Sequence, residues 1–199
     1  MRIVLRRVFA ILLSLWSRLS DAATHPVSPN EDFSNSTLQI HATASDGWHG
    51  IARTASSIAF GRNGASGTET FVAAVILFHI PEFSDSDAFT QYVREGVARD
   101  SPADRFEPIE SSVHYSIERS YPCVRYHAVS MERKVHIAPF FRKDLRIENV
   151  ALYCRHPDKP GLGFAVSYSH RGGRGDYDID EEAESFIDSV QVIPPTKQP

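Results

Sequence analysis

The sequence predicts an α+β fold in which a mostly antiparallel sheet has helices packed on it. Runs of β-branched and aromatic residues, bounded by Gly and Pro, recur along the chain and predict strands. Two segments, at about Asp85–Arg99 and near the C-terminus, place apolar residues at helical spacing. Two cysteines, Cys123 and Cys154, flank segments that fit a single antiparallel register. This order of elements indicates a layered α+β domain.

The N-terminus has the three parts of a secretory signal. Met1–Arg7 is basic, Val8–Trp16 is apolar, and small residues at Ala22 and Ala23 suit a signal peptidase. The apolar run is shorter than the roughly 20 residues of a membrane span. We therefore expect cleavage of residues 1–23 and a periplasmic or extracellular location. Arg18 interrupts the apolar run and leaves a retained anchor as the alternative.

The rest of the chain is predicted to hold one domain. Residues 24–37 are rich in Pro, Ser and Asn, so we expect a flexible lead-in there. Residues 38–194 show no internal repeat and no linker between two cores, and about 160 residues suit a single globular domain. Residues 195–199 are expected to be a tail.

Before the cysteines, the pattern predicts three strands and a helix. Short strands are expected around Trp48–Ile51 and Ile58–Phe60. Glu69–Ile80 is apolar on both faces, which is typical of a central strand. A helix over Asp85–Arg99 follows, with Ser84 as its N-cap. Its buried face is predicted to hold Ala88, Phe89, Tyr92, Val93 and Val97.

The two cysteines predict a disulfide between neighbouring strands. An even cysteine count in an exported chain is typical of a disulfide, and two buried free thiols are the alternative. Val124–Val129 and Ile147–Tyr153 both have strand composition. If Cys123 lies opposite Cys154, most of the apolar residues of both strands share one face, whereas a shift of one residue scatters them. That register pairs Val124 with Tyr153, Tyr126 with Ala151, and Ala128 with Asn149.

Three further strands and a second helix are predicted around this hairpin. Strands are expected around residues 113–117, over 164–170, and at the edge over 192–193. A helix capped by Asp178 or Asp180 is predicted to bury Ile179, Ala183, Phe186, Ile187 and Val190. The order of elements resembles the layout of the Mog1/PsbP-like α/β/α sandwich. The resemblance is one of layout, carries no residue motif, and implies no function.

No catalytic or cofactor motif is present in the sequence. Gly-x-Ser-x-Gly, P-loop, dinucleotide and His-Glu-x-x-His patterns do not occur, so we expect no cofactor and no metal. The most site-like group is His127, His156 and Asp158, which a small exported hydrolase or a metal-binding protein would use. The predicted register separates His127 from His156 by more than about 10 Å. Arg174-Gly175-Asp176 matches an adhesion tripeptide, although matches of three residues often arise by chance.

The charge distribution gives a better functional lead. Residues 1–23 hold four Arg and one Asp, so the rest of the chain has 17 Lys+Arg against 24 Asp+Glu, a net charge of −7, which argues against nucleic-acid binding. Residues 119–159 nevertheless carry nine basic and four acidic residues. We expect the strands of the hairpin to be joined by a connector, residues 133–145, that mixes cations with aromatic groups. Its candidate partner-binding residues are Arg133, Lys134, Phe140, Phe141, Arg142 and Lys143.

This lead favours a non-enzymatic role. We expect an exported binding or accessory domain of the bacterial envelope, whose connector contacts an envelope protein or an anionic membrane surface. The alternative is that Phe140 and Phe141 fold into the core while the cations pair with the acidic last helix.

Overall fold

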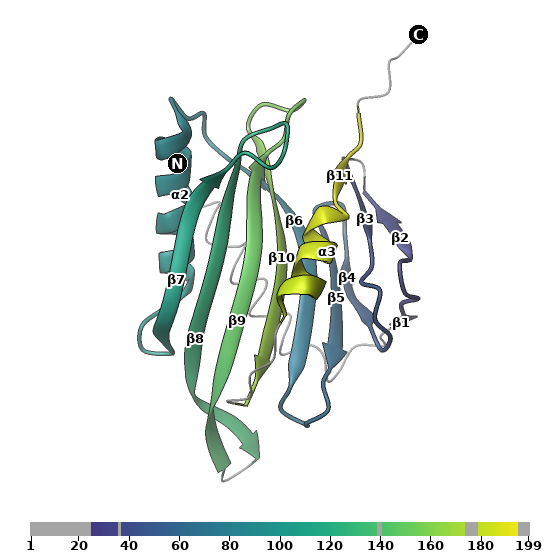
Figure 1. Ribbon diagram of the computed structural model, residues 1–199, viewed down its shortest axis with the longest axis vertical. Coiled ribbons are helices and arrows are strands. Elements are labelled where there is room, and N and C mark those ends of the chain that lie inside the picture. Colours follow the sequence, from purple (N-terminus) through teal and green to yellow (C-terminus); the bar gives the residue numbers. More distant parts are fainter. Residues whose placement is uncertain (1–24, 36, 139–140, 174–178, 195–199) are drawn as a thin grey trace.

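The structure is a computed structural model that describes residues 25–35, 37–138, 141–173 and 179–194. The expected signal (residues 1–23), the tail (195–199), the Arg174–Asp176 tripeptide and Asp178 lie outside the described residues. A search of the described residues finds no helix with the length and apolar character of a membrane span. The broad α+β class is confirmed, because in the described part of the chain two short helices accompany two antiparallel sheets (Figure 1).

The larger sheet has eight strands in the order β1-β4-β5-β6-β10-β9-β8-β7, and the smaller has three in the order β11-β3-β2. The elements of the larger sheet are β1 (His25–Pro26), β4 (His49–Arg53), β5 (Ser57–Asn63), β6 (Thr70–His79), β7 (Phe106–Ser116), β8 (Cys123–Ala138), β9 (Phe141–Arg155) and β10 (Leu162–Gly172). Those of the smaller sheet are β2 (Asp32–Ser34), β3 (Leu38–His41) and β11 (Gln191–Val192), and the helices are α2 (Ser86–Asp100) and α3 (Asp180–Asp188).

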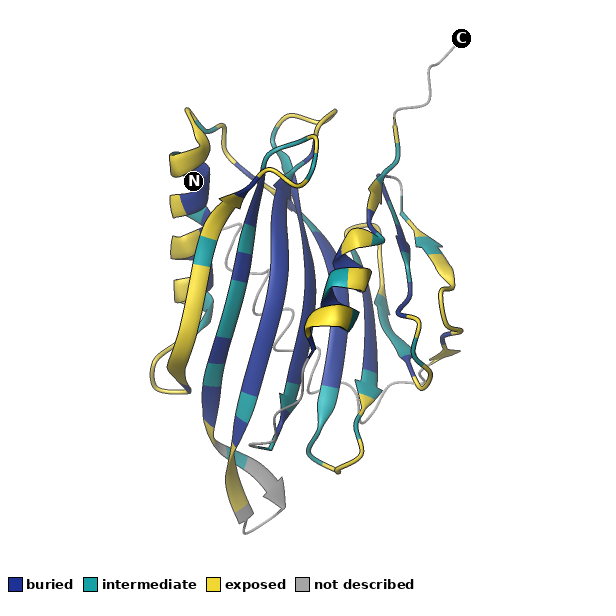
Figure 2. Ribbon diagram, in the orientation of Figure 1, coloured by how far each residue is buried: buried dark blue, intermediate teal, exposed yellow. Residues whose placement is uncertain are grey.

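Two apolar clusters cover the two faces of the larger sheet. Residues alternate between the faces, so β6 contributes Ala73 and Val75 to one cluster and Ala74 and Ile76 to the other. The first cluster includes α3 and the smaller sheet, and its face is called the α3 face below. The second includes α2, and its face is called the α2 face. Figure 2 shows the buried interior running through the central strands, as expected for a sheet covered on both sides.

Helix α2 forms where the sequence predicts it, with one correction at its start. The N-cap is Asp85 and not Ser84, because the Asp85 side chain accepts a hydrogen bond of 2.8 Å from the backbone N–H of Ala88. The Ser84 hydroxyl donates to Asp85 instead. The bond from Ala88, followed by that from Ser84, lowers the pKa of Asp85. Phe89, Val93 and Val97 are buried as predicted.

The disulfide and its register are confirmed. Cys123 and Cys154 are bonded and lie directly opposite each other, with 4.1 Å between their Cα atoms. Val124 then pairs with Tyr153, Tyr126 with Ala151, and Ala128 with Asn149, as predicted. The bond joins the adjacent strands β8 and β9 near one end of their pairing, where both cysteines are fully buried.

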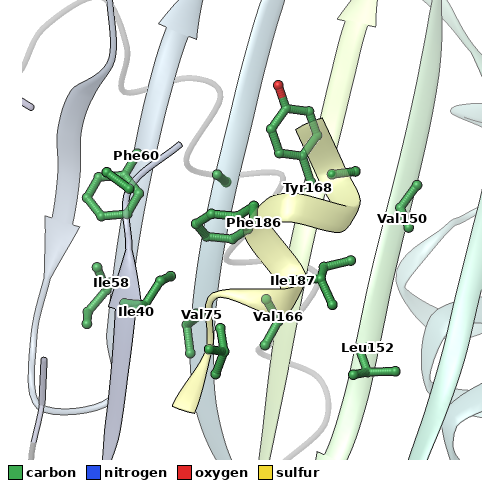
Figure 3. Packing of buried hydrophobic residues seen from close by; sticks show 14 of the residues in the cluster. Ile40, Ile58, Phe60, Val75, Val150, Leu152, Val166, Tyr168, Phe186 and Ile187 are labelled. Atoms are coloured by element: carbon green, nitrogen blue, oxygen red, sulfur yellow. The ribbon is translucent and has the colours of Figure 1, made fainter. Parts of the chain in front are cut away.

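Helix α3 buries the stripe that its sequence predicts. Phe186 and Ile187 point from α3 toward Phe60, Val75 and Val166 of the sheet (Figure 3). The expected cap is wrong at Asp180, which is the first helical residue. Ile179 precedes the helix there and makes no side-chain cap. The physical reason is that Ile179 is needed in the core, where 1% of it is exposed.

The expected lead-in, residues 24–37, contributes two short strands to the fold. Strand β1 pairs with β4, and β2 pairs with β3. Between them Val27 is buried and donates its backbone N–H to the carbonyl of Trp48, 2.9 Å away. Pairing with β3 and β4 therefore orders the backbone of β1 and β2, although the composition of this segment predicts a flexible chain.

Candidate functional site

A two-stranded arm extends from one end of the larger sheet. The last pair between β7 and β8 is Phe106 with Glu132, and the last pair between β10 and β9 is Gly172 with Arg146. Strands β8 and β9 continue beyond both neighbours to the pair Ala138–Phe141. Residues 133–145 are called the arm below. In its described part, 133–138 and 141–145, β8 and β9 form a ribbon with no other described strand beside it (Figure 1).

The expected connector is wrong in its structure, because most of residues 133–145 are paired strand. The sequence predicts that residues 133–145 join the two strands as a connector, whereas in the structure the β8–β9 pairing continues through most of that segment. Val135 and Ile137 are β-branched, which favours extended backbone over a loop. Register shifts after Glu132 and His136 twist the ribbon relative to the sheet.

Ion pairs fix the base of the arm. Glu132 is the last residue of β8 that has β7 beside it, and its side chain is 4% exposed. One carboxylate oxygen accepts from Nε of Arg105 at 2.7 Å and the other from Nε of Arg171 at 2.7 Å. Arg133 pairs with Glu107 at 2.6 Å and donates its backbone N–H to the carbonyl of Arg105 at 2.9 Å. Contacts from both flanking strands therefore hold the base in one place.

The candidate partner-binding residues occupy this ribbon. Arg133, Arg142 and Lys143 are exposed. Lys134 and Phe141 lie in the strands, but nothing is described of their side chains, and Phe140 is outside the described residues. The proposed pairing of the arm cations with the last helix is not what the described contacts show. Instead, Arg125 pairs with Glu184, Arg119 with Asp188, Arg62 with Glu182, and Arg133 with Glu107.

The structure does not bring His127, His156 and Asp158 together. His127 lies opposite Val150, six residues before His156 along β9, which corresponds to roughly 20 Å. Its Nε2 is 3.0 Å from a carboxylate oxygen of Glu148. His156 instead accepts the backbone N–H of Asp158 on Nδ1 at 3.2 Å, which makes a local turn. Among the described residues, no group of three His, Cys, Asp or Glu is arranged to hold a metal.

The sequence does not predict the buried pair of His170 with Glu69. His170 of β10 is 2% exposed, and its Nε2 lies 3.1 Å from a carboxylate oxygen of Glu69, just before β6. Burial lowers the pKa of His170, although the hydrogen bond to Glu69 opposes that shift. No local sequence pattern indicates this pair, because the two residues are 101 positions apart in the chain.

Acid is expected to destabilise the fold through His156. Burial lowers the pKa of His156, with the charge of Lys159 as a second cause. The folded state then binds a proton less readily than the unfolded state, whose pKa is about 6.5. This contribution to stability is present above that pH and is lost as the pH falls toward the folded pKa. Urea unfolding at a series of pH values measures the loss.

Two variants isolate that contribution. His156→Gln removes one titrating group and should flatten the decline in stability below about pH 6.5. His114→Gln, at an exposed position of β7, should leave the decline as in the wild type. An equally steep decline in the His156→Gln variant and the wild type would assign the effect to other groups.

The sequence also does not predict a partly buried polar network around Glu182. The Tyr168 hydroxyl donates to one carboxylate oxygen of Glu182 at 2.7 Å, and Arg62 donates to the same oxygen at 3.1 Å. The guanidinium carbon of Arg62 lies 4.4 Å from the centre of the Phe71 ring and 5.2 Å from that of Trp48. Every polar partner lies on another element, so the network ties α3 to the sheet. Its role is structural, because its carboxylate is engaged by donors of the same chain.

Comparisons with known proteins add no assignment. No protein-family model matches the sequence, and no curated protein matches it. The function must therefore be inferred from the geometry of the chain.

Proposed function

We propose that this protein is an exported, non-catalytic binding or accessory domain of the bacterial envelope, and that the arm contacts its partner. The observation that carries the proposal is a ribbon extending past the sheet with its base fixed by ion pairs. The buried disulfide supports an oxidising compartment, which agrees with the signal pattern of residues 1–23. The periplasm or the cell exterior is the proposed location.

A two-stranded ribbon without support from other elements is poorly stabilised in water. An isolated two-stranded hairpin is marginal, because it lacks a third strand or a packed face. The arm holds Val135, Ile137 and two Phe residues, together with four cations against the single acid Asp144. Its strands would gain apolar burial and charge pairing on contact with an anionic surface. The same composition is unexplained if the arm is only a connection.

A matched pair of charge reversals tests the contact. Lys143→Glu places an acid on the arm, and Lys159→Glu makes the same change at an exposed position outside it. Each cation near an anionic surface contributes about 1 kcal/mol, so reversal at Lys143 should weaken association by about tenfold or more. Co-sedimentation with anionic vesicles and pull-down from solubilised envelopes measure association with the two partner classes. Equal loss in both variants would mean that only net charge matters.

The apolar part of the arm requires its own test. Replacing Phe140 and Phe141 by Ser should weaken the same association while leaving the circular dichroism spectrum and the disulfide unchanged. Loss of the folded signal would instead identify these residues as core and contradict their role in binding.

The finer fold relationship is also a proposal. Helix α2 in one apolar cluster and α3 in the other support the layout of the Mog1/PsbP-like α/β/α sandwich. That likeness would concern architecture and carries no activity. The separate partners of His127 and His156 argue against the hydrolase or metal-binding alternative.

A further inference from the structure

Strand β7 leaves one edge of the larger sheet open. It has 11 residues, stands last in the order of that sheet, and pairs with β8 alone among the described strands. Helix α2 contacts β7 and β8 from the α2 face. Figure 2 shows β7 exposed along most of its length on the opposite face. The outward backbone donors and acceptors of this edge are therefore open to pairing with another strand.

Exposed apolar side chains gather on the same strand. Among the described residues, the exposed large apolar side chains all lie in β7 or directly after it: Ile109, Tyr115 and Ile117. Residues 106–117 include no Lys or Arg, although basic side chains commonly protect an edge strand from pairing. Pro108 and the bulge between Pro108 and Glu110 interrupt only the first part of the strand. Residues 110–116 thus form a regular edge without basic side chains.

The pairing of β8 with β9 shows which way the backbone groups of β7 point. Arg155 donates its backbone N–H to the Pro122 carbonyl at 2.9 Å, so these two residues form a hydrogen-bonded pair. The next pair, Cys123 with Cys154, is then a non-hydrogen-bonded pair, in agreement with its Cα separation of 4.1 Å. Cys123 therefore directs its backbone groups away from β9 and toward β7, where it pairs with Ser116.

Alternation along β7 extends this result to the middle of the strand. Ser112 and His114 bond to β8 through their backbone, because hydrogen-bonded pairs alternate along an antiparallel ladder. Ser111 and Val113 then direct their backbone N–H and C=O groups to the open edge. In agreement, the Val113 carbonyl accepts a hydrogen bond of 3.3 Å from the Arg94 side chain of α2. A carbonyl has two lone pairs, so it can accept a second bond from another strand.

We propose that β7 pairs antiparallel with β7 of a second copy of this chain, around a twofold axis at Ser112. Ser111 of each copy exchanges backbone hydrogen bonds with Val113 of the other, which gives two bonds in each of two equivalent pairs. Glu110 of each copy lies opposite His114 of the other, so that a carboxylate faces an imidazole that can donate to it. The two large sheets then form one continuous sheet.

Charge complementarity selects this register over its neighbours. Opposite residues must share a face of the sheet, so the axis can only move by whole residues along β7. An axis at Glu110 or His114 would place each of these residues opposite its own copy, and like charges directly opposite are unfavourable. An axis at position 111 or 113 would leave Glu110 opposite a serine. Within residues 110–114, only the axis at Ser112 pairs the acid with the imidazole.

The same register also covers the exposed apolar residues. Tyr115 of each copy lies opposite Ile109 of the other, and aromatic residues pair favourably with β-branched residues across strands. The arm continues beyond the Phe106 end of β7 and takes no part in this pairing. The inference therefore does not rest on the proposed function, and either can fail without the other.

Cysteine crosslinking tests the register. Ser112→Cys places two thiols opposite each other at the axis, in the same kind of pair as Cys123 and Cys154, so mild oxidation should join the protein into covalent dimers. Ser111→Cys is the matched control, because its two copies lie on a diagonal of about 7–8 Å, too far apart for a disulfide. It should crosslink at least about tenfold more slowly. Peptide mapping checks that the native disulfide stays intact.

Sedimentation equilibrium tests the backbone pairing. The wild type should associate into dimers. Ser111→Pro removes one outward N–H from each copy without removing a bond to β8, so it should raise the dimer dissociation constant by about tenfold or more. Ser111→Ala keeps the N–H and should dimerise as the wild type does. An unchanged circular dichroism spectrum establishes that each variant is folded.

Three results would overturn the proposal. The first is a wild type that stays monomeric at its highest soluble concentration, which would leave the edge to a strand of a different protein. The second is equal crosslinking rates for Ser111→Cys and Ser112→Cys. The third is a dimer that Ser111→Pro leaves unchanged while the arm variant Lys143→Glu weakens it, since that dimer would form through the arm.

Discussion

Replacing both Cys123 and Cys154 by Ser is expected to lower the free energy of unfolding by about 3–4 kcal/mol. The bond closes a loop between positions 31 apart and so restricts the unfolded chain. For a domain of this size, the melting temperature should fall by roughly 10 °C. Urea unfolding of the oxidised protein and of the double variant measures the difference.

The control for this prediction is the wild type under reducing conditions. If the disulfide acts through the unfolded chain, reductant should destabilise the wild type by a similar amount and leave the double variant unchanged. Equal stability of the oxidised wild type and the variant would show that strand pairing alone holds this part of the sheet. A reaction of the unreduced protein with two equivalents of thiol reagent would contradict the bond itself.

Phe186→Ala is expected to cost about 3–5 kcal/mol of stability, because it leaves a cavity between α3 and the sheet. The Phe186 ring is 1% exposed, and its centre lies 6.4 Å from that of Phe60 and 6.5 Å from that of Tyr168. Loss of the ring removes the main apolar contact beneath the Glu182 network. Chemical denaturation monitored by the fluorescence of the buried Trp48 reports the change.

Ser185→Ala is the matched control, because Ser185 precedes Phe186 on the exposed side of α3. A surface change of this kind should alter stability by no more than about 0.5 kcal/mol. A small cost for Phe186→Ala, close to that of the control, would mean that α3 can shift to fill the space. In that case the helix would be loosely attached, contrary to the hydrogen bonds that Glu182 accepts.

The amino-acid sequence is sufficient to predict the local elements and one long-range pairing. Alternating apolar residues and the two cysteines allow a single register for β8 and β9, since a shift of one residue would bury polar side chains. The apolar run of β6 and the helical spacing from Phe89 to Val97 likewise follow from residues close together in the chain. Short-range periodicity is sufficient for such features.

The ends of the elements, and the sites that they form together, depend on the three-dimensional fold. The arm exists because β7 and β10 stop at Phe106 and Gly172 while their neighbours continue, and no local pattern specifies a neighbour's end. The Glu182 network draws its residues from elements far apart in sequence. The physical reason is that β10 inserts between β6 and β9, which makes neighbours of segments that no spacing along the chain relates.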